Sequence, residues 1–384
     1  MSSLRNSWRS GIHLFSKEQV LGEVIEEVVR AEGSPVLIMD KGVIQERYSQ
    51  FCHEFPGAEV YYAVKANPDE EIVRLLWKLN AGFEIASEGE LDLLLRLGIP
   101  PQKVVSSNPV KSPAFIKSAY ASGIDRFAFD SYTEIEKLSQ FAPRSRVYVR
   151  LSVSNEGSEW PLDRKFGIEV EGAEELLLQA EKKNLKPWGI AFHVGSQCVS
   201  PATWAKAIEK SREVWDWARS RGIELTSLNV GGGFPIEYTK PVPPIAETGR
   251  VIRNAIAKAF SGNIQVMLEP GRALVGEAGV LVATVIAKAV REGRKWLYLD
   301  VGVFNGLMET MGGIMYPLIT RRDGSDDRWV VAGPSCDSVD VISDEVELPE
   351  LEVGDRVYII SAGAYTTAYA SHFDGFPIPE VCFI

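Results

Sequence analysis

Eight short apolar runs, each followed by a stretch of helical periodicity, lie between about residues 58 and 272 and strongly constrain the fold. The runs cover residues 59–65, 82–86, 104–107, 126–130, 146–152, 188–194, 227–232 and 265–269. Their alternation with helices indicates repeated βα units. In the stretch 202–219, for example, one stripe carries Ala207, Ile208, Val214, Trp215 and Ala218. Eight such units predict an α/β fold with a closed (β/α)8 TIM-like barrel rather than an open doubly wound sheet, and they predict chemistry at the carboxyl ends of the strands.

The chain after Arg272 loses the helical spacing and predicts a C-terminal all-β domain. Its β-rich runs cover residues 280–288, 295–299, 329–332 and 356–360, and a further run at 35–39 is expected to join them. Residues 17–31 have the pattern of an amphipathic helix. We therefore expect three parts: an N-terminal helix and strand over 1–40, the barrel over 41–275 and the β domain over 276–384.

The charge of the chain excludes some classes of partner. With 52 acidic residues against 41 basic ones, the net charge is −11, which argues against a nucleic-acid-binding surface but permits local binding of a phosphate group. The four cysteines show neither C-x-x-C pairing nor the density of a disulfide scaffold, so we expect a reduced, cytoplasmic protein without a metal site. No run approaches the length needed to span a bilayer, so no membrane partner is expected.

Two barrel strands end in residues that could carry chemistry. Lys65 ends the first run in Tyr-Ala-Val-Lys, where its amine could form a Schiff base. A lysine that merely reaches solvent from a strand end fits the same motif equally well. His193 ends the sixth run beside Ser196, so its imidazole could lie on an aromatic cofactor while the serine donates to a phosphate. A histidine on an apolar strand is, taken alone, more often a satisfied core residue.

The last two barrel strands end in a pattern suited to an anion. Gly231, Gly232 and Gly233 follow the seventh run, and glycines expose backbone N–H groups to a phosphate, although a tight turn explains them equally well. The eighth run ends in Glu-Pro-Gly-Arg at 269–272, which supplies a carboxylate and a guanidinium. Because barrels often bind phosphate at these two loops, the triplet and Arg272 are expected at one place.

The predicted β domain offers a thiol, a carboxylate and a phenol. Cys336 precedes Asp337 in Gly-Pro-Ser-Cys-Asp, and Tyr365 lies in a Gly-Ala-Tyr turn. Taken alone, each of these three side chains would usually have a structural role. A cysteine, for example, becomes a nucleophile or proton donor only where partner groups surround it.

Together these motifs resemble those of the ornithine/diaminopimelate/arginine decarboxylase family of barrel-type enzymes that use pyridoxal 5′-phosphate (PLP). The resemblance covers roughly residues 35–384 and rests on the order and spacing of six motifs. They are Tyr-Ala-Val-Lys at 62–65, His-Val-Gly-Ser at 193–196, Gly-Gly-Gly-Phe-Pro at 231–235, Glu-Pro-Gly-Arg at 269–272, Gly-Pro-Ser-Cys-Asp at 333–337 and Gly-Ala-Tyr at 363–365.

The resemblance implies a role for each matched residue. Lys65 would carry PLP, His193 would stack on its ring, and Glu269 would pair with the pyridine nitrogen. Glu84 and Arg150 match family positions near the cofactor. The residues expected at the phosphate are Ser196, Gly232, Gly233, Gly271, Arg272 and Tyr365.

The resemblance also implies a homodimer with active sites shared across its interface. Cys336 would supply a proton after CO2 departs, and Asp337 would bind the distal amine of the substrate, both from the partner subunit. Lys165 and Asp340 match an ion pair across that interface.

The substrate implied is ornithine or lysine, converted to a diamine as in polyamine biosynthesis. Cys336-Asp337 resembles the ornithine/lysine branch, whereas diaminopimelate enzymes typically carry Cys-Glu. Tyr316 matches a substrate-binding position, but Pro317 follows it where ornithine decarboxylases usually have an aspartate. One alternative is therefore a larger amino acid, such as a siderophore-pathway intermediate or diaminopimelate. Another is an inactive regulatory protein, against which the presence of both Lys65 and Cys336 speaks.

Overall fold

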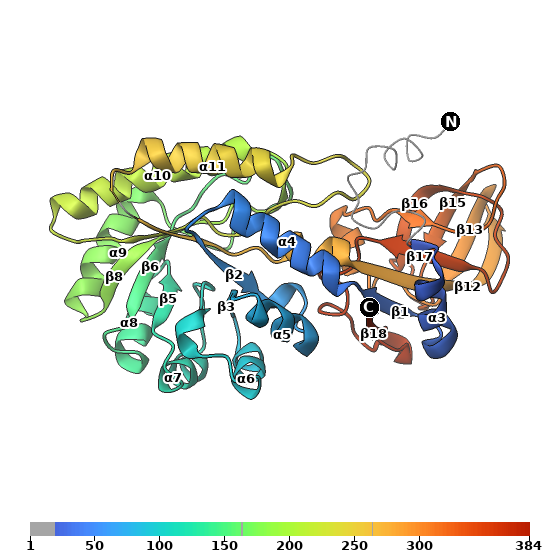
Figure 1. Cartoon of the computed structure of the whole chain (residues 1–384), viewed down its shortest axis with the longest axis horizontal. Helices are drawn as coiled ribbons and strands as arrows, with labels where there is room; N and C mark the ends of the chain where they lie inside the picture. The colour runs from blue at the N-terminus through green and yellow to red at the C-terminus, as the bar shows by residue number, and fades with distance from the viewer. Residues whose placement is uncertain (1–19, 163, 263) are drawn as a thin grey trace. The chain divides into compact units, whose positions relative to one another are not determined.

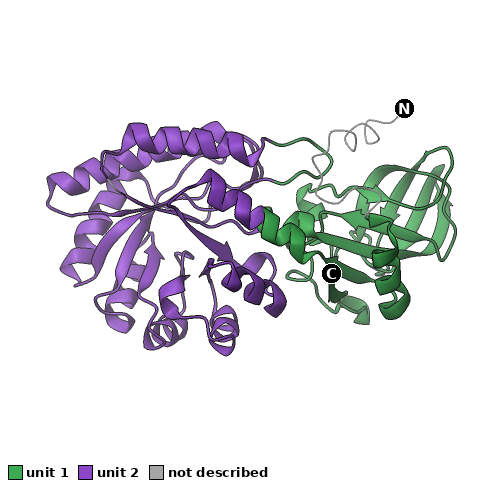
Figure 2. Ribbon diagram, viewed as in Figure 1, with its two compact units in different colours: residues 1–46, 236–242, 272–384 green, residues 47–235, 243–271 purple. Residues whose placement is uncertain are grey.

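The computed structural model describes residues 20–162, 164–262 and 264–384. The described residues form two compact units, coloured separately in Figure 2. The first, here called the β unit, comprises the described residues within the ranges Met1–Glu46, Ile236–Val242 and Arg272–Ile384. The second, here called the barrel unit, comprises Arg47–Pro235 and Pro243–Gly271.

Eight parallel strands form the wall of the barrel unit, and several of them are labelled in Figure 1. Their order is β4-β3-β2-β11-β10-β8-β6-β5. The two ends of this order meet because Ser106, directly after β4, forms a parallel bridge with Phe127 in β5. Seven of the eight predicted runs contain one of these strands and the eighth, 188–194, overlaps β8, so the predicted TIM-like barrel is confirmed. The strands are β2 (Glu59–Ala63), β3 (Gly82–Glu84), β4 (Val104–Val105), β5 (Arg126–Phe129), β6 (Arg146–Arg150), β8 (Lys186–Ala191), β10 (Ser227–Asn229) and β11 (Gln265–Leu268).

Helices follow the strands, and several begin at a capping residue in the loop after the preceding strand. Side chains of Asp69, Ser87, Ser112 and Ser131 accept backbone N–H groups in the first turns of four consecutive helices. These caps fix the loops at the carboxyl ends of the strands. The helices are α4 (Lys41–Glu54), α5 (Glu70–Lys78), α6 (Glu88–Arg96), α7 (Pro113–Ala121), α8 (Tyr132–Phe141), α9 (Val170–Lys182), α10 (Pro201–Ser220) and α11 (Ile245–Ala259).

A cluster of buried side chains from the strands makes up part of the barrel core. Tyr61, Tyr148 and Trp188 are its largest members, and Val105, Ala128, Ala191 and Met267 complete it. Tyr148 and Trp188 meet edge to face, with ring centroids 5.9 Å apart. The core therefore comes from strands far apart in the sequence and holds the strand ends in register.

The β unit is a mostly antiparallel sheet in the order β14-β17-β12-β13-β15-β16, with β1 paired to β12 and β18 paired to β1. The pairs β13–β15 and β1–β18 are parallel. Strand β1 lies within the run 35–39 and pairs with two strands of this sheet. Its strands are β1 (Val36–Met39), β12 (Gly279–Arg291), β13 (Arg294–Leu299), β14 (Leu318–Ile319), β15 (Asp327–Ala332), β16 (Val341–Leu348), β17 (Arg356–Ile360) and β18 (Glu380–Phe383).

Several elements escaped prediction from sequence. Strand β16 lies at the end of the sheet order, and it carries Asp344, Glu345 and Glu347, which mask its β-rich character. Strands β14 and β18 are short, as are β7 (Ser158–Trp160) and β9 (Ser196–Cys198) of the barrel unit, which pair with each other. The helix predicted over 17–31 is observed as α3 (Glu23–Glu32), and residues 17–19 lie outside the described residues.

Among the described residues, no helix combines the length and apolar character needed to cross a bilayer.

Candidate active site

The carboxyl ends of the barrel strands carry most of the residues singled out from the sequence. Each lies at the last residue of its strand or within a few residues after it, so the closed barrel brings them to one face. They are Lys65 after β2, Glu84 at the end of β3, Arg150 at the end of β6, His193 after β8, Gly231, Gly232 and Gly233 after β10, and Glu269 and Gly271 after β11.

Lys65 lies in a short 3-10 turn, η2 (Val64–Ala66), and its amine contacts a buried carboxylate. The distance from Lys65 Nζ to Glu84 Oε2 is 2.5 Å, and the lysine side chain is 47% exposed whereas that of Glu84 is 3% exposed. The other oxygen, Glu84 Oε1, accepts the backbone N–H of Ser107 at 3.4 Å. The amine is therefore oriented by one buried anion while it stays accessible to a small molecule.

Glu269 is a buried carboxylate with two side-chain donors. Ser107 Oγ donates to its Oε1, and Asn229 Nδ2 donates to the same oxygen at 2.6 Å. Burial raises the pKa of Glu269 to about 7, helped by the neighbouring charge of Glu84 and opposed by the two hydrogen bonds and by Lys65. A carboxyl group whose pKa lies near neutrality can hold or release a proton under physiological conditions.

His193 is a neutral imidazole in the barrel unit. Burial, together with the nearby cations Arg150 and Lys65, lowers its pKa to about 3. Its Nδ1 accepts the backbone N–H of Gly195 at 3.1 Å, so the single ring proton lies on Nε2. A neutral ring with a fixed tautomer suits stacking on a flat cofactor.

The glycines of the loops after β8 and β10 are required by close backbone packing. Gly231 and Gly233 have φ of 71° and 90°, which only glycine adopts readily. A Cβ at Gly231 would lie 2.2 Å from the oxygen of Phe192, and one at Gly233 would lie 2.1 Å from the oxygen of Gly195. The tight turn considered from sequence is therefore present, and the same lack of side chains leaves the backbone open to a phosphate.

Ser196 and Arg150 complete the barrel residues named from sequence. Ser196 opens β9, and its backbone oxygen accepts a hydrogen bond from Ser158 Oγ at 2.6 Å. The guanidinium of Arg150 lies over the ring of Phe166, 5.1 Å from its centroid.

Arg272 belongs to the β unit and is held by a carboxylate that sequence reasoning missed. Its Nη1 and Nη2 each lie 2.7 Å from an oxygen of Glu309, and both side chains are 3% exposed. Its Nη1 also donates to Tyr238 at 2.6 Å, and the guanidinium lies over the ring of Tyr365 at 4.8 Å. Tyr316 packs edge to face on Tyr238 at 5.2 Å, and its hydroxyl has no hydrogen-bond partner among the described residues.

Cys336 and Asp337 are exposed on the β unit. The carboxylate of Asp374 accepts the backbone N–H of Cys336 at 3.0 Å, and its hydrogen bond with the thiol raises the pKa of Cys336. The thiol therefore keeps its proton at neutral pH. Asp340 is buried instead, and its two oxygens accept the N–H groups of Val303 and Ser335.

Sequence reasoning missed four polar residues of the barrel site: Ser107, Asn229, Tyr148 and Glu90. Glu90 Oε2 accepts the N–H of Ala86 at 2.6 Å, and burial, followed by the charge of Glu84, raises the pKa of Glu90 to about 7. For two of these residues the sequence did contain a signal, since Ser107 and Asn229 lie inside otherwise apolar runs. A polar side chain buried in such a run must find a hydrogen-bond partner.

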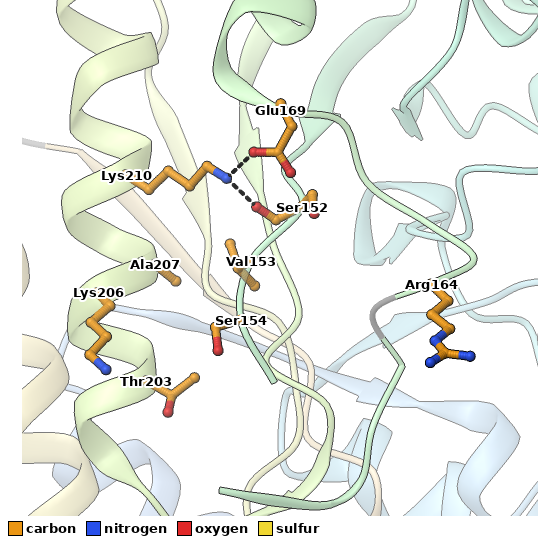
Figure 3. A pocket seen from close by; sticks show the side chains of 9 residues that line it. All are labelled: Ser152, Val153, Ser154, Arg164, Glu169, Thr203, Lys206, Ala207 and Lys210. Carbon is orange, nitrogen blue, oxygen red and sulfur yellow. Dashed lines mark hydrogen bonds and ion pairs between the residues drawn. The ribbon is translucent and has the colours of Figure 1, made fainter. Parts of the chain in front are cut away.

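A separate cavity of about 490 Å³ lies in the barrel unit beside α10 (Figure 3). Its lining includes Lys206, Lys210 and Arg164, but Lys210 is paired with Glu169 at 2.5 Å, and Lys206 is paired with Glu156 at 2.9 Å. None of the residues proposed from sequence lines it. We therefore do not assign the candidate active site to this cavity.

Three comparisons with known proteins bear on this site. The family model described as "Pyridoxal-dependent decarboxylase, pyridoxal binding domain" matches residues 41–276. The lysine/ornithine decarboxylase of Selenomonas ruminantium is 36% identical over 357 residues, which are 91% of this chain and 90% of that protein. The ornithine decarboxylase of Schizosaccharomyces pombe is 34% identical, with coverage of 96% and 90%. The crystal structure of a Vibrio vulnificus lysine/ornithine decarboxylase complexed with cadaverine superposes with a TM-score of 0.90 at 34% identity, covering 97% of this chain and 100% of that one.

Proposed function

This chain belongs to the family of pyridoxal-dependent decarboxylases, and on that premise we propose that it converts ornithine or lysine to the corresponding diamine. It is a PLP-dependent amino acid decarboxylase. The proposal is supported by relatives named lysine/ornithine decarboxylase and by a solved relative that holds cadaverine. The S. pombe relative is named ornithine decarboxylase.

The positions of Lys65 and Glu269 are the observation that carries the proposal. They follow β2 and β11, which are neighbouring strands of the barrel. Adjacent strand ends thus carry an amine that can join PLP covalently and a carboxylate that can pair with the ring nitrogen. When bound, PLP withdraws electrons from the Cα of an attached amino acid and so stabilises the charge left by departing CO2.

The barrel residues fit this cofactor. Part of the Lys65 side chain is exposed and would be accessible to the aldehyde, while the buried carboxylate of Glu269 would accept a hydrogen bond from the protonated ring nitrogen. The neutral ring of His193 would stack on the pyridine face, and Glu84 would orient the amine of Lys65. The groups that would hold the phosphate or surround the cofactor are Arg150, Ser196, Gly232, Gly233, Gly271, Arg272 and Tyr365.

The β unit would complete the site of a partner subunit in a homodimer. Cys336 and Asp337 are exposed on their own chain, as residues that act on a partner must be. The bond to Asp374 keeps the Cys336 thiol protonated, so it can donate that proton to Cα. Asp337 would pair with the distal ammonium of the substrate. Tyr316 would lie near the substrate. Asp340 is buried and both of its carboxylate oxygens are bonded within its own chain, so we do not propose the interface pair with Lys165 that the resemblance implies.

We place the protein in the cytoplasm, because all four cysteines are free thiols, the state that a reducing compartment maintains. We also propose that residues 41–275 act as the PLP-binding domain, and that residues 1–40 act together with the β domain over 276–384. Hydrogen–deuterium exchange followed by mass spectrometry would test these boundaries, because two separately cooperative domains should differ in exchange protection on either side of residues 40 and 275.

Substrate comparison tests the proposed function. Purified protein with PLP should release CO2 from ornithine or lysine with a kcat/KM at least about tenfold above that for arginine and meso-diaminopimelate. The reason is that the single carboxylate of Asp337 would bind the distal ammonium of a short diamino acid. Lys65→Ala is the negative control. A preference for meso-diaminopimelate or arginine would contradict the proposed substrate.

A larger, more apolar amino acid is the second candidate substrate. Pro317 stands where an acidic residue is expected, and the preceding segment exposes Met308, Met311 and Met315 to between 38% and 59%. Apolar side chains on this segment favour a substrate with an apolar extension. Faster turnover of an Nε-acylated lysine than of lysine would support this alternative.

A further inference from the structure

The carboxylate of Glu269 receives both of its side-chain hydrogen bonds on a single oxygen. Ser107 Oγ and Asn229 Nδ2 each donate to Oε1, and no donor among the described residues is bonded to Oε2. Glu269 is itself buried, with a residue exposure of 8%. The carboxylate is therefore held from one side and presents one oxygen to a bound ring.

The orientation of the Asn229 amide is determined by its other contact. Its Oδ1 accepts the backbone N–H of Gly231 at 2.9 Å. Because that N–H can only donate, the amide oxygen must face Gly231 and the amide nitrogen must face Glu269. A flipped amide would place oxygen against carboxylate and N–H against N–H.

The orientation of the Ser107 hydroxyl follows from the same reasoning. Its Oγ lies 2.7 Å from Tyr148 OH as well as next to Glu269. Since the single hydroxyl proton of Ser107 goes to the carboxylate, Tyr148 must donate to Ser107. Burial raises the pKa of Tyr148 well above its ordinary value, so the phenol keeps the proton that this chain of bonds needs.

Gly231 links the carboxylate to the glycine turn. Its N–H is bound by Asn229, and its carbonyl oxygen accepts the backbone N–H of Glu269 at 2.8 Å. The N–H and the carbonyl of Gly231 are thus both connected to the network that holds Glu269. The turn proposed for the phosphate and the carboxylate proposed for the ring nitrogen are therefore positioned as one assembly.

We propose that Ser107 and Asn229 are positioning residues that keep Glu269 ionised toward a bound PLP ring, so that the shared proton lies on the ring nitrogen, and that Asn229 also sets the position of the glycine turn. This inference rests on the proposed function. Two donors on Oε1 stabilise the carboxylate form, and their removal would make Glu269 the stronger base and draw the proton to it. The charged and titratable groups around Glu269 are Glu84, Lys65, Arg150 and Tyr148.

Ser107→Ala tests the proton position without disturbing the turn. With PLP labelled with 15N in the ring, the nitrogen resonance of the wild-type protein should be that of a protonated pyridine at pH 8. In Ser107→Ala it should move toward the unprotonated value. We expect kcat to fall about tenfold, as for loss of one hydrogen bond to a charged group, and the Kd for PLP to change less than about twofold.

Asn229→Ala should show the same nitrogen shift and, because Gly231 loses its partner, at least about tenfold weaker PLP binding as well. Asn229→Asp should retain function where the introduced carboxyl group is protonated, since its O–H can replace the amide N–H as a donor to Glu269. The retained function should decline as pH rises, because the introduced carboxyl group then ionises and faces the carboxylate of Glu269. This dependence on pH distinguishes a donor role from a packing role.

Two matched controls come from the chain itself. Ser106→Ala changes a buried neighbour whose hydroxyl has no hydrogen-bond partner among the described residues. Asn305→Asp changes a buried amide of the β unit that also binds backbone groups at both ends. Neither should move the ring-nitrogen resonance.

The outcomes separate this inference from the proposed function. An unprotonated ring nitrogen in the wild-type protein would contradict the pairing of Glu269 with PLP itself. A protonated nitrogen in wild type, Ser107→Ala and Asn229→Ala alike would overturn only the positioning role. The same conclusion follows if Ser106→Ala shifts the resonance as much as Ser107→Ala does.

Discussion

Glu309→Gln should destabilise the β unit strongly, because Glu309 neutralises the buried guanidinium of Arg272. Both side chains are 3% exposed, and two contacts of 2.7 Å make the pair bidentate. Glutamine keeps the shape of the side chain and removes its charge. The guanidinium then loses its bidentate carboxylate and keeps the contact with the hydroxyl of Tyr238 at 2.6 Å.

The expected loss follows from the desolvation of this cation. Breaking a buried pair by removing one partner costs about 3–5 kcal/mol, because the remaining charge stays buried and uncompensated. For a unit of this size each kcal/mol lowers the melting temperature by roughly 2–4 °C. We therefore expect Glu309→Gln to lower the Tm by roughly 6–20 °C.

Thermal unfolding of the protein without PLP, followed by circular dichroism, measures this change separately from cofactor binding. Glu345→Gln is the control, because Glu345 has a side chain that is 63% exposed and lies 3.6 Å from Arg328. Its Tm should change by less than about 2 °C, as for a surface pair. The double variant Arg272→Met/Glu309→Leu should recover much of the loss, because no charge is left unpaired. A Tm for Glu309→Gln within about 2 °C of wild type would refute the reasoning.

Four further predictions test the site. Lys65→Ala should lose the borohydride-reducible link to PLP, and peptide mapping that finds the label on another lysine would overturn the assignment. Glu269 has its pKa raised to about 7, so the folded protein holds a proton that the unfolded chain releases between about pH 4.5 and 7. Its contribution to stability should therefore fall as pH rises through this window, and Glu269→Gln should flatten the pH dependence of the free energy of unfolding measured with urea. Asp337→Ala should raise the KM for a diamino acid about tenfold or more with little change in PLP affinity, and equal changes in both would contradict a role in binding the distal amine. Mixed Lys65→Ala and Cys336→Ala subunits, after exchange, should recover about a quarter of wild-type activity, whereas no recovery in verified mixed dimers would exclude action of Cys336 on the partner.

The sequence by itself determined the barrel and the identity of most strand-end residues. Alternation of apolar runs with helical stretches is a local property, since each strand or helix buries one face set by its own period. Lys65, His193 and Glu269 could be named because each ends such a run, and strand ends of a barrel meet at one face. The edge strand β16 was missed because its charges conceal the pattern.

Only the tertiary structure decided how these residues are paired. Ser107 and Glu269 are 162 positions apart, and Arg272 and Glu309 are separated by 37 positions. The first contact depends on barrel closure through Ser106 and the second on the folding of the β unit, neither of which local periodicity encodes. A buried polar group must find a partner, but the chain reveals which partner only when distant strand ends are brought together.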